Sequence, residues 1–227
     1  MSESGSEQIT CRIITKPALH FIQANIPLGF IDKINAYVDN VRDSANDYSG
    51  VLIGQIKQDK RSAQLQLNLK DQVPENLAAL IVQAGTQYVQ FHGLRAKVTA
   101  NDMWTIHSYA GDYNPLHDHG SNTDFGLSSV VYLMVPPAIT EKKPVESGGA
   151  PRLTMASGAC DGFTQFLWGT HGMKDLSLLR PPTQQYIKPE VGKLIVFPSW
   201  LLHGVSPFFG EGERRTLSCN MDVEILE

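Results

Sequence analysis

The sequence predicts an α+β protein that is mainly β, in which an α-rich N-terminal part packs on an all-β C-terminal part. Two stretches of helical periodicity lie within residues 1–95, and short strand-like runs separated by turn residues fill residues 96–227. A chain of 227 residues can also bury a sizeable core without disulfide staples. We therefore expect a single domain over residues 1–227, with a supporting part followed by a β core.

The supporting part combines two amphipathic helices with short strands. After a polar tail, residues 10–24 suggest a strand or two. Pro27 then opens a helical pattern that repeats at three- and four-residue steps through Leu28, Ile31, Ile34, Val38 and Val41. A second amphipathic helix is predicted over 75–92. Between the helices, we predict strands at 51–56 and 63–69.

The C-terminal part consists of strand-like runs bounded by Gly, Pro, Asn and Asp. Such a series is typical of a sandwich, a barrel or a jelly roll. The two long Gly- and Pro-rich connections, 137–150 and 157–182, are expected to form a functional rim, because long loops in a compact domain usually carry function. The predicted strands are 98–110, 127–135, 152–156, 184–189, 193–198, 203–208 and 214–225.

Composition and charge argue against several classes of protein. The 19 Lys and Arg residues against 23 Asp and Glu residues give a net charge of −4, which exerts no overall attraction on nucleic acid or on an anionic membrane. No apolar run approaches the ~18 residues of a membrane span, and the N-terminus lacks the apolar segment of a secretory signal. The three cysteines form no CxxC pair, which argues against a disulfide framework. We expect a cytoplasmic protein that does not act at a membrane.

A short histidine motif is the strongest chemical signal. His117 and His119 lie two residues apart, and in an extended chain such side chains point to the same side while Asp118 points away. His203 follows an apolar strand and is the best candidate for a third ligand. Three ligands leave other metal positions open for a cosubstrate and oxygen. Asp118 rotating in as the second ligand remains an alternative.

An arginine pair near the C-terminus could anchor an anion. Arg214, Thr216, Ser218 and Asn220 share one face of the predicted last strand, whereas Arg215 belongs to the other face. A guanidinium with a hydroxyl two residues further on suits a carboxylate. A solvated strand edge is the alternative interpretation of the arginine pair.

Four motifs in order resemble a known enzyme family. They read W-x-I-x-x-Y-x-G-D-Y-N-P-L-H-D-H-G, L-S-S-V-V-Y-L-x-V-P, G-K-L-I-V-F-P-S-x-L-x-H-x-V-x-P-F and G-E-R-R-T-L-S-x-N. This stretch, from Trp104 to Asn220, resembles the iron(II)/2-oxoglutarate-dependent oxygenases. It is similar in particular to the prolyl-hydroxylase-like branch and the short enzymes of marine bacteria and their phages. The resemblance implies a double-stranded β-helix (jelly-roll) catalytic core over 96–227, supported by the N-terminal helices.

The resemblance also implies roles for individual residues. His117 and His203 fall on the two metal histidines of the family, and His119 stands where the usual motif, His-x-Asp, has its carboxylate. The implied ligands of Fe(II), which are also the catalytic residues, are thus His117, His119 and His203. For the 2-oxoglutarate cosubstrate, the matching positions are Arg214, Thr216, Tyr132 and Tyr109.

The implied activity is hydroxylation of a substrate C–H bond by molecular oxygen, with release of succinate and carbon dioxide. The expected partner is a small-molecule or peptidyl substrate, with a prolyl residue of a peptide or protein as the first choice and a free amino acid or another metabolite as the second. Two other functions remain open: a three-histidine dioxygenase of the cupin type that uses no 2-oxoglutarate, and a non-catalytic metal-binding jelly roll. Arg214, Thr216 and Tyr132 argue against the cupin type, which does not need a carboxylate pocket.

Overall fold

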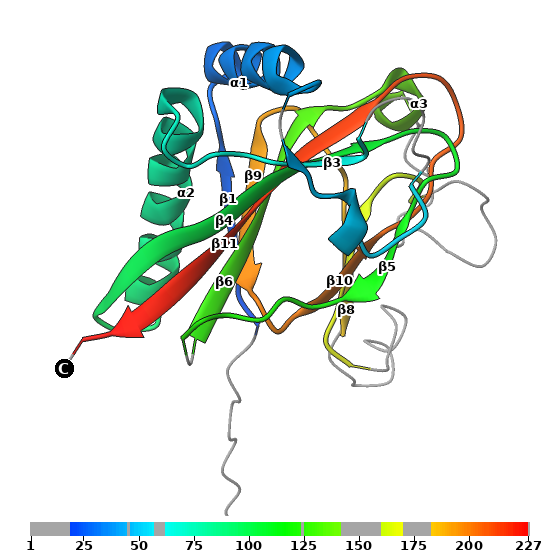
Figure 1. The fold of residues 1–227 in the computed structure, drawn as a ribbon. Helices are drawn as coiled ribbons and strands as arrows, with labels where there is room; N and C mark the ends of the chain where they lie inside the picture. Colours follow the sequence, from blue (N-terminus) through cyan, green and yellow to red (C-terminus); the bar gives the residue numbers. More distant parts are fainter. Residues whose placement is uncertain are drawn as a thin grey trace, which may run out of the picture.

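Two antiparallel sheets face each other, and two long helices cover the outer face of the larger sheet (Figure 1). Every strand pair recorded within these sheets is antiparallel. The computed structural model describes residues 19–44, 46–56, 62–123, 125–141, 160–169 and 183–226.

The larger sheet has seven strands in the order β1-β9-β6-β11-β4-β3-β2. Its centre is formed by the three longest strands, which pair over most of their length. In the register of the central strand, Asn220 lies opposite Asp102 of one neighbouring strand and Ser128 of the other. The strands are β1 (Ile22–Asn25), β2 (Asn46–Asp47), β3 (Gln64–Gln66), β4 (Ala96–Ser108), β6 (Phe125–Met134), β9 (Lys193–Pro198) and β11 (Arg214–Ile225).

The smaller sheet has four strands in the order β5-β10-β7-β8. A mainly apolar cluster lies between the two sheets and includes the fully buried rings of Tyr132, Phe166 and Phe197. Two of its members, Val130 and Phe197, also line the pocket that the sheets leave between them. The strands are β5 (Asn114–His117), β7 (Thr164–Leu167), β8 (Gln184–Ile187) and β10 (Leu202–Val205).

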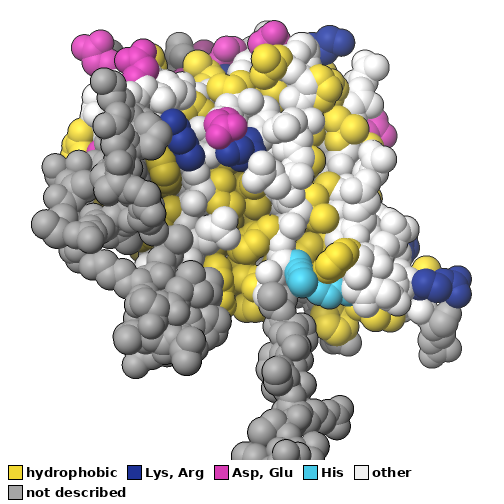
Figure 2. Space-filling view, turned by 180° about the vertical axis from the view of Figure 1, so that it is seen from behind, with side chains coloured by type: hydrophobic (Ala, Val, Ile, Leu, Met, Phe, Trp, Pro, Cys, Tyr) yellow, Lys and Arg dark blue, Asp and Glu magenta, His cyan; other side chains and the backbone are white. Residues whose placement is uncertain are grey.

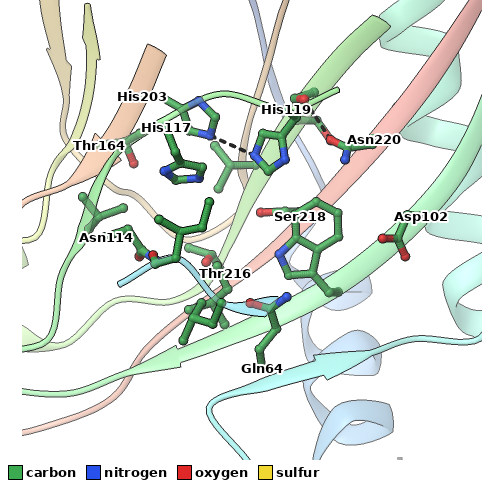
Figure 3. A pocket seen from close by; sticks show the side chains of 18 of the residues that line it. Gln64, Asp102, Asn114, His117, His119, Thr164, His203, Thr216, Ser218 and Asn220 are labelled. Carbon is green, nitrogen blue, oxygen red and sulfur yellow. Dashed lines mark hydrogen bonds between the residues drawn. The ribbon is translucent and has the colours of Figure 1, made fainter. Parts of the chain in front are cut away.

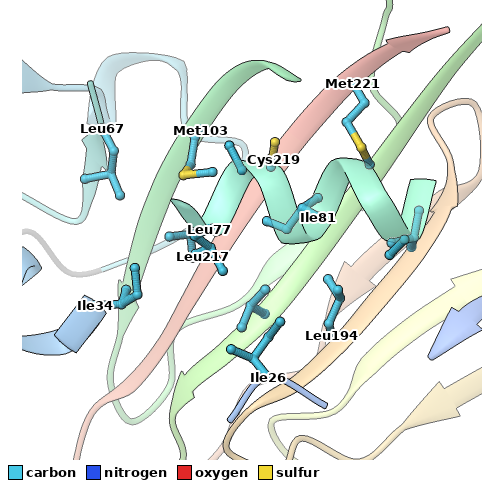
Figure 4. Packing of buried hydrophobic residues seen from close by; sticks show 14 of the residues in the cluster. Ile26, Ile34, Leu67, Leu77, Ile81, Met103, Leu194, Leu217, Cys219 and Met221 are labelled. Atoms are coloured by element: carbon cyan, nitrogen blue, oxygen red, sulfur yellow. The ribbon is translucent and has the colours of Figure 1, made fainter. Parts of the chain in front are cut away.

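The main core lies between the larger sheet and the helices α1 (Leu28–Val41) and α2 (Gln72–Phe91). Figure 4 shows Leu77 and Ile81 of α2 packed over the sheet, whose strand β11 carries Leu217, Cys219 and Met221. Close approach of α2 depends on Gly85: a Cβ there would lie 2.9 Å from the sulfur of Met221. The short helix α3 (Pro137–Thr140) lies at the end of β6.

The structure confirms most predicted elements, shows one predicted strand to be wrong and adds three short strands, β2, β5 and β7, that we did not predict. The predicted strand at 51–56 is wrong: the chain forms a 3₁₀ turn at Ser49–Val51 and only an isolated bridge between Gln55 and Tyr113. Gly54, with φ +151°, brings the backbone so near Tyr113 that a regular strand cannot continue. Conversely, the connection 157–182 contains a strand, β7, that we did not predict.

Two further strand predictions lie wholly or partly outside the described residues: 152–156 and the first part of 10–24. The described part of 10–24 does contain the start of β1. The division of the chain into a single unit with a supporting part and a β core stays a prediction.

The surface opposite to the view of Figure 1 is of mixed character. Figure 2 shows hydrophobic side chains in its middle, with acidic and basic side chains scattered towards its margins. Among the described helices, none is both long and apolar enough to cross a bilayer.

Candidate metal and cosubstrate site

Three histidines, two on neighbouring strands and one just beyond a strand end, converge on one point. His117 ends β5 and pairs across the sheet with His203 of β10, while His119 lies two residues further along. One ring nitrogen from each histidine lies within 4.8 Å of the others. Figure 3 shows the three rings turned towards one another at one side of a pocket. This spacing allows a single ion to contact all three.

The backbone fixes which ring nitrogens are available. Nδ1 of His117 lies 2.8 Å from the carbonyl oxygen of Pro115, and Nδ1 of His203 lies 2.9 Å from that of Leu201. An Nδ1–H that donates to a carbonyl leaves Nε2 as the ligand atom, as is usual around protein-bound metals. Nε2 of His203 lies 3.2 Å from Nε2 of His119.

Protonation also favours metal binding at this cluster. Burial, and then the neighbouring His117, lower the pKa of His119 to about 4 and that of His203 to about 3. Both rings are therefore neutral near pH 7, as metal ligation requires. Three imidazoles are a donor set that suits iron, so the residues fit the metal that the sequence predicts. Asp118 is exposed and does not belong to the converging group.

Arg214 lies fully buried at another end of the same pocket. Its Nε donates to the carbonyl oxygen of Gly162 at 3.1 Å, and its Nη2 donates to Oγ1 of Thr164 at 3.3 Å. The guanidinium carbon lies 5.5 Å from the ring centre of Tyr132, whose hydroxyl is 2.7 Å from the same Thr164 oxygen. A buried guanidinium with hydroxyl neighbours suits a carboxylate.

The pocket between the sheets joins these two groups. It holds about 200 Å³ and is lined by all three histidines, Arg214 and Thr216. That volume admits a small cosubstrate and a small part of a substrate, rather than a folded partner. Its remaining lining residues come from eight strands and from the segment that follows β2 (Figure 3): Tyr48, Val51, Leu52, Ile53, Gln64, Asp102, Trp104, Ile106, Asn114, Ser128, Ser129, Val130, Thr164, Phe197, Val205, Ser218 and Asn220.

The two tyrosines that we expected to contact the cosubstrate do not line the pocket. Tyr132 contacts Arg214 from behind, within the apolar cluster, rather than from the pocket lining. Tyr109 is not among the lining residues. It follows the end of β4 in a turn closed by Asp112, and its hydroxyl accepts a hydrogen bond from Arg42 at 3.2 Å.

Sequence reasoning missed Thr164, Asp102 and Trp104 at this site. Thr164 belongs to the strand β7 that we did not predict. Asp102 and Trp104 lie on the pocket face of β4, and the strand alternation of 98–110 could have indicated both. His107 belongs to the opposite face of β4, where it is fully buried and hydrogen-bonded to Thr105 and Glu213.

A second charged cluster lies on that opposite face and joins β11 to helix α1. Glu213 accepts hydrogen bonds from His107 Nδ1 at 2.6 Å and from Arg215 Nε at 2.8 Å, and it lies 3.4 Å from Arg42. Burial would raise the pKa of Glu213, but the hydrogen bonds from His107 and Arg215 outweigh burial and hold this pKa well below its usual range. Arg215 also pairs with Asp39 of α1 at 2.7 Å.

Comparisons with solved structures show the fold. A prolyl-4-hydroxylase of Pseudomonas putida has 16% sequence identity and a TM-score of 0.53, over 92% of this chain and 94% of that one. A viral collagen prolyl hydroxylase from Paramecium Bursaria Chlorella virus-1, in its 2-oxoglutarate complex, has 15% identity and a TM-score of 0.51, over 88% and 94%. HygX from Streptomyces hygroscopicus, with nickel and 2-oxoglutarate bound, has 12% identity and a TM-score of 0.51, over 89% and 82%. These neighbours confirm the predicted jelly-roll core.

A comparison with family models connects this fold to chemistry. No curated protein matches the chain. The family model described as "Putative 2OG-Fe(II) oxygenase" matches residues 102–220, slightly more than half of the chain, and this range contains the three histidines and Arg214. The chain therefore belongs to the 2OG-Fe(II) oxygenase family and is an enzyme that uses Fe(II), 2-oxoglutarate and molecular oxygen.

Proposed function

We propose that this oxygenase hydroxylates a C–H bond at the three-histidine site, with His117, His119 and His203 as the iron ligands and Arg214 as the anchor of 2-oxoglutarate. The observation that carries this proposal is the convergence of three imidazole nitrogens in a pocket that also contains a buried guanidinium. A metal-binding site alone would not require that guanidinium.

Some residues of the pocket bind the cosubstrate, and others keep water away from the reacting groups. Bound Fe(II), with 2-oxoglutarate and oxygen, supplies the oxidation of the C–H bond and releases succinate and carbon dioxide. Arg214 holds the distal carboxylate of the cosubstrate, with the hydroxyls of Thr164 and Thr216 beside it. Val130 and Phe197 form an apolar wall that keeps water from the reacting groups.

The substrate that we propose is a prolyl residue of a peptide or protein, with a free amino acid or another small metabolite as the second choice. The motif resemblance to the prolyl-hydroxylase-like branch supports the prolyl residue. Exposed apolar side chains at the pocket, Val51 and Ile53, also suit a substrate that extends beyond the cavity.

The cupin-type alternative is disfavoured by the same buried guanidinium. Such an enzyme binds no 2-oxoglutarate and has no use for a buried Arg214 with two hydroxyl neighbours. A non-catalytic domain is disfavoured because three metal ligands and the anchor for the anion are all present.

Succinate formation from 2-oxoglutarate by the iron-loaded protein tests the proposal. We expect iron-dependent succinate, and at least a tenfold drop in Arg214→Ala, because a hydrogen-bonded charge contributes about 1.5–3 kcal/mol. Lys97→Ala is the matched control, since it removes a cation that is 68% exposed and distant from the pocket lining. Absence of both succinate formation and 2-oxoglutarate binding would overturn the proposal. Proline-containing peptides that gain one oxygen atom would support the prolyl substrate.

A further inference from the structure

The pocket is electrically polarised along the strands of the larger sheet. Arg214 begins β11, whereas Asp102 pairs with Asn220, six residues further along the same strand. Six strand residues span about 20 Å, so these two charges mark opposite ends of the pocket. Figure 3 shows Thr164, the partner of Arg214, and Asp102 on opposite sides, with the three histidines between them.

Asp102 has only neutral partners. Its Oδ1 accepts hydrogen bonds from the backbone N–H of Met103 at 2.9 Å and from Gln66 Nε2 at 3.2 Å, and its Oδ2 accepts one from the Tyr48 hydroxyl at 3.3 Å. Within the described part of the chain, no Lys or Arg forms an ion pair with it. The carboxylate is half-buried and borders the pocket, and it is the one acidic side chain among the lining residues that the structure describes.

The surroundings of Asp102 favour a positive charge. Trp104 follows it on the same face of β4 and lies with its ring 5.6 Å from that of His119, so this end of the pocket adjoins the metal ligands. Aromatic faces such as those of Trp104 and Tyr48 attract cations. Asp102 would repel an anionic group at this end of the pocket. Arg214, the cation at the other end, is assigned to the cosubstrate in the proposed function.

A second hollow also borders Asp102 and has the same character. It holds about 540 Å³, and its described lining contains Asp71 and the side-chain amides of Gln66, Asn68 and Asn101 but no Lys or Arg. Asp102, the hydrogen-bond partner of Gln66, lines both hollows. A group that lies in the second hollow therefore meets carboxylates and amides.

From this arrangement we infer that Asp102 binds a protonated amine of the substrate and so selects a cationic substrate class. The inference rests on the proposed function, which it narrows. The amine can belong to a ring, as in an N-terminal proline, or to a linear chain, as in a lysine side chain or a small metabolite. In either case, Asp102 holds the charge near Trp104 while the carbon to be oxidised lies towards the histidines.

Two isosteric pairs of probes test the inference: pyrrolidine with tetrahydrofuran, and n-butylamine with n-butanol. Within each pair the molecules have similar size, but only the amine is charged at neutral pH. Binding is measured by ligand-observed NMR on the full chain loaded with zinc and 2-oxoglutarate, since zinc supports no redox turnover. Comparison of the two pairs distinguishes a ring amine from a linear amine.

We expect at least one amine to bind tenfold or more tightly than its neutral isostere. Asp102→Asn, which keeps the shape of the side chain, removes that preference. Glu224→Gln, which removes an exposed carboxylate outside both hollows, retains it. Because the comparison of isosteres needs only the wild-type chain, the inference stays testable if Asp102→Asn fails to fold.

Three outcomes overturn the inference: neutral isosteres that bind as well as the amines, amines that fail to bind, or an amine preference that survives in Asp102→Asn. Binding of 2-oxoglutarate is measured on the same sample. If 2-oxoglutarate binds and amines show no preference, only the role of Asp102 fails. If 2-oxoglutarate does not bind, the proposed function fails.

Discussion

At the scale of single residues, strand geometry decides which side chain after His117 can reach a metal. Successive residues of an extended chain point to opposite sides, and Asp118 is exposed while His119 joins the other histidines. Among the described residues, the converging group thus consists of three imidazoles and includes no carboxylate. Imidazole ligands, which carry no charge, would leave more of the positive charge of a bound metal for the carboxylates of the cosubstrate.

His119→Ala is expected to lower metal affinity by about 100-fold or more, because loss of a direct ligand costs more than the 10–100-fold typical of an outer partner. Asp118→Ala should bind metal like the wild type. Titration with cobalt(II), followed by its visible absorption, measures both affinities. The opposite ranking of the two variants would show that Asp118 is the ligand.

His107 makes stability depend on pH. Burial is the main cause that lowers its pKa, and the charges of Arg42 and Arg215 add to it, while Glu213 opposes them. The folded state therefore keeps His107 neutral where the unfolded state, with a pKa of about 6.5, binds a proton. The free energy of unfolding is therefore highest above about pH 6.5 and decreases as the pH falls below that value.

In His107→Gln, the free energy of unfolding should fall less steeply between pH 7 and 5 than in the wild type. The difference in slope can reach about 1.4 kcal/mol per pH unit, the limit for one proton. Urea unfolding of the metal-free proteins measures it, and the other histidines cancel because both proteins contain them. Equal slopes would contradict a neutral buried His107.

At the scale of elements, alternate residues of β11 face two different layers: the pocket between the sheets and the helices. Arg214 faces the pocket between the sheets, whereas Arg215 faces the helices and pairs with Glu213 and with Asp39 of α1. Adjacent arginines thus face different surroundings: Arg214 lines the pocket, where we propose that it anchors the cosubstrate, and Arg215 joins the helix layer to the sheet.

Substitution of the two arginines should separate these effects. Arg214→Ala should weaken 2-oxoglutarate binding at least tenfold with little loss of stability. Arg215→Ala should cost about 3 kcal/mol of unfolding free energy, because it leaves Glu213 buried without its main cation, while the folded protein binds 2-oxoglutarate normally. Calorimetric binding and urea unfolding of both variants provide the comparison, and an equal loss of affinity in both would refute the separation.

Regular alternation explains how much the sequence could predict. The long strand 214–225 was predicted with its two faces because one face is polar and the other largely apolar, and the histidine motif was found because both histidines share one side. The segment 51–56 is apolar enough for a strand, but its apolar residues border the pocket instead of a core. Strand β7 lies in the segment 157–182, which its Gly and Pro residues led us to interpret as a connection, so Thr164 was missed with it.

At the scale of the whole molecule, the larger sheet is shared by two cores. Its outer face packs on α1 and α2, and its inner face forms the pocket and the apolar cluster with the smaller sheet. Loss of packing on the outer face should therefore also disturb the inner face. This coupling predicts that the chain unfolds as one unit.

Two optical probes can test this coupling, because they report on different parts of the chain. Helices α1 and α2 belong to residues 1–95 and dominate far-UV circular dichroism, whereas Trp104, Trp168 and Trp200 all belong to residues 96–227. In urea, we expect both signals to change at one midpoint, as in a two-state transition.

Ile81→Ala should move both signals together to lower urea concentration. Ile81 is fully buried between α2 and the sheet, and its truncation should cost about 2–5 kcal/mol through lost burial and the cavity left behind. Leu80→Ala is the matched control: it removes a neighbouring side chain that is 37% exposed and should cost less than Ile81→Ala. A variant in which the helical signal is lost first, with the tryptophan signal unchanged, would show that the helix layer and the β core are separate folding units.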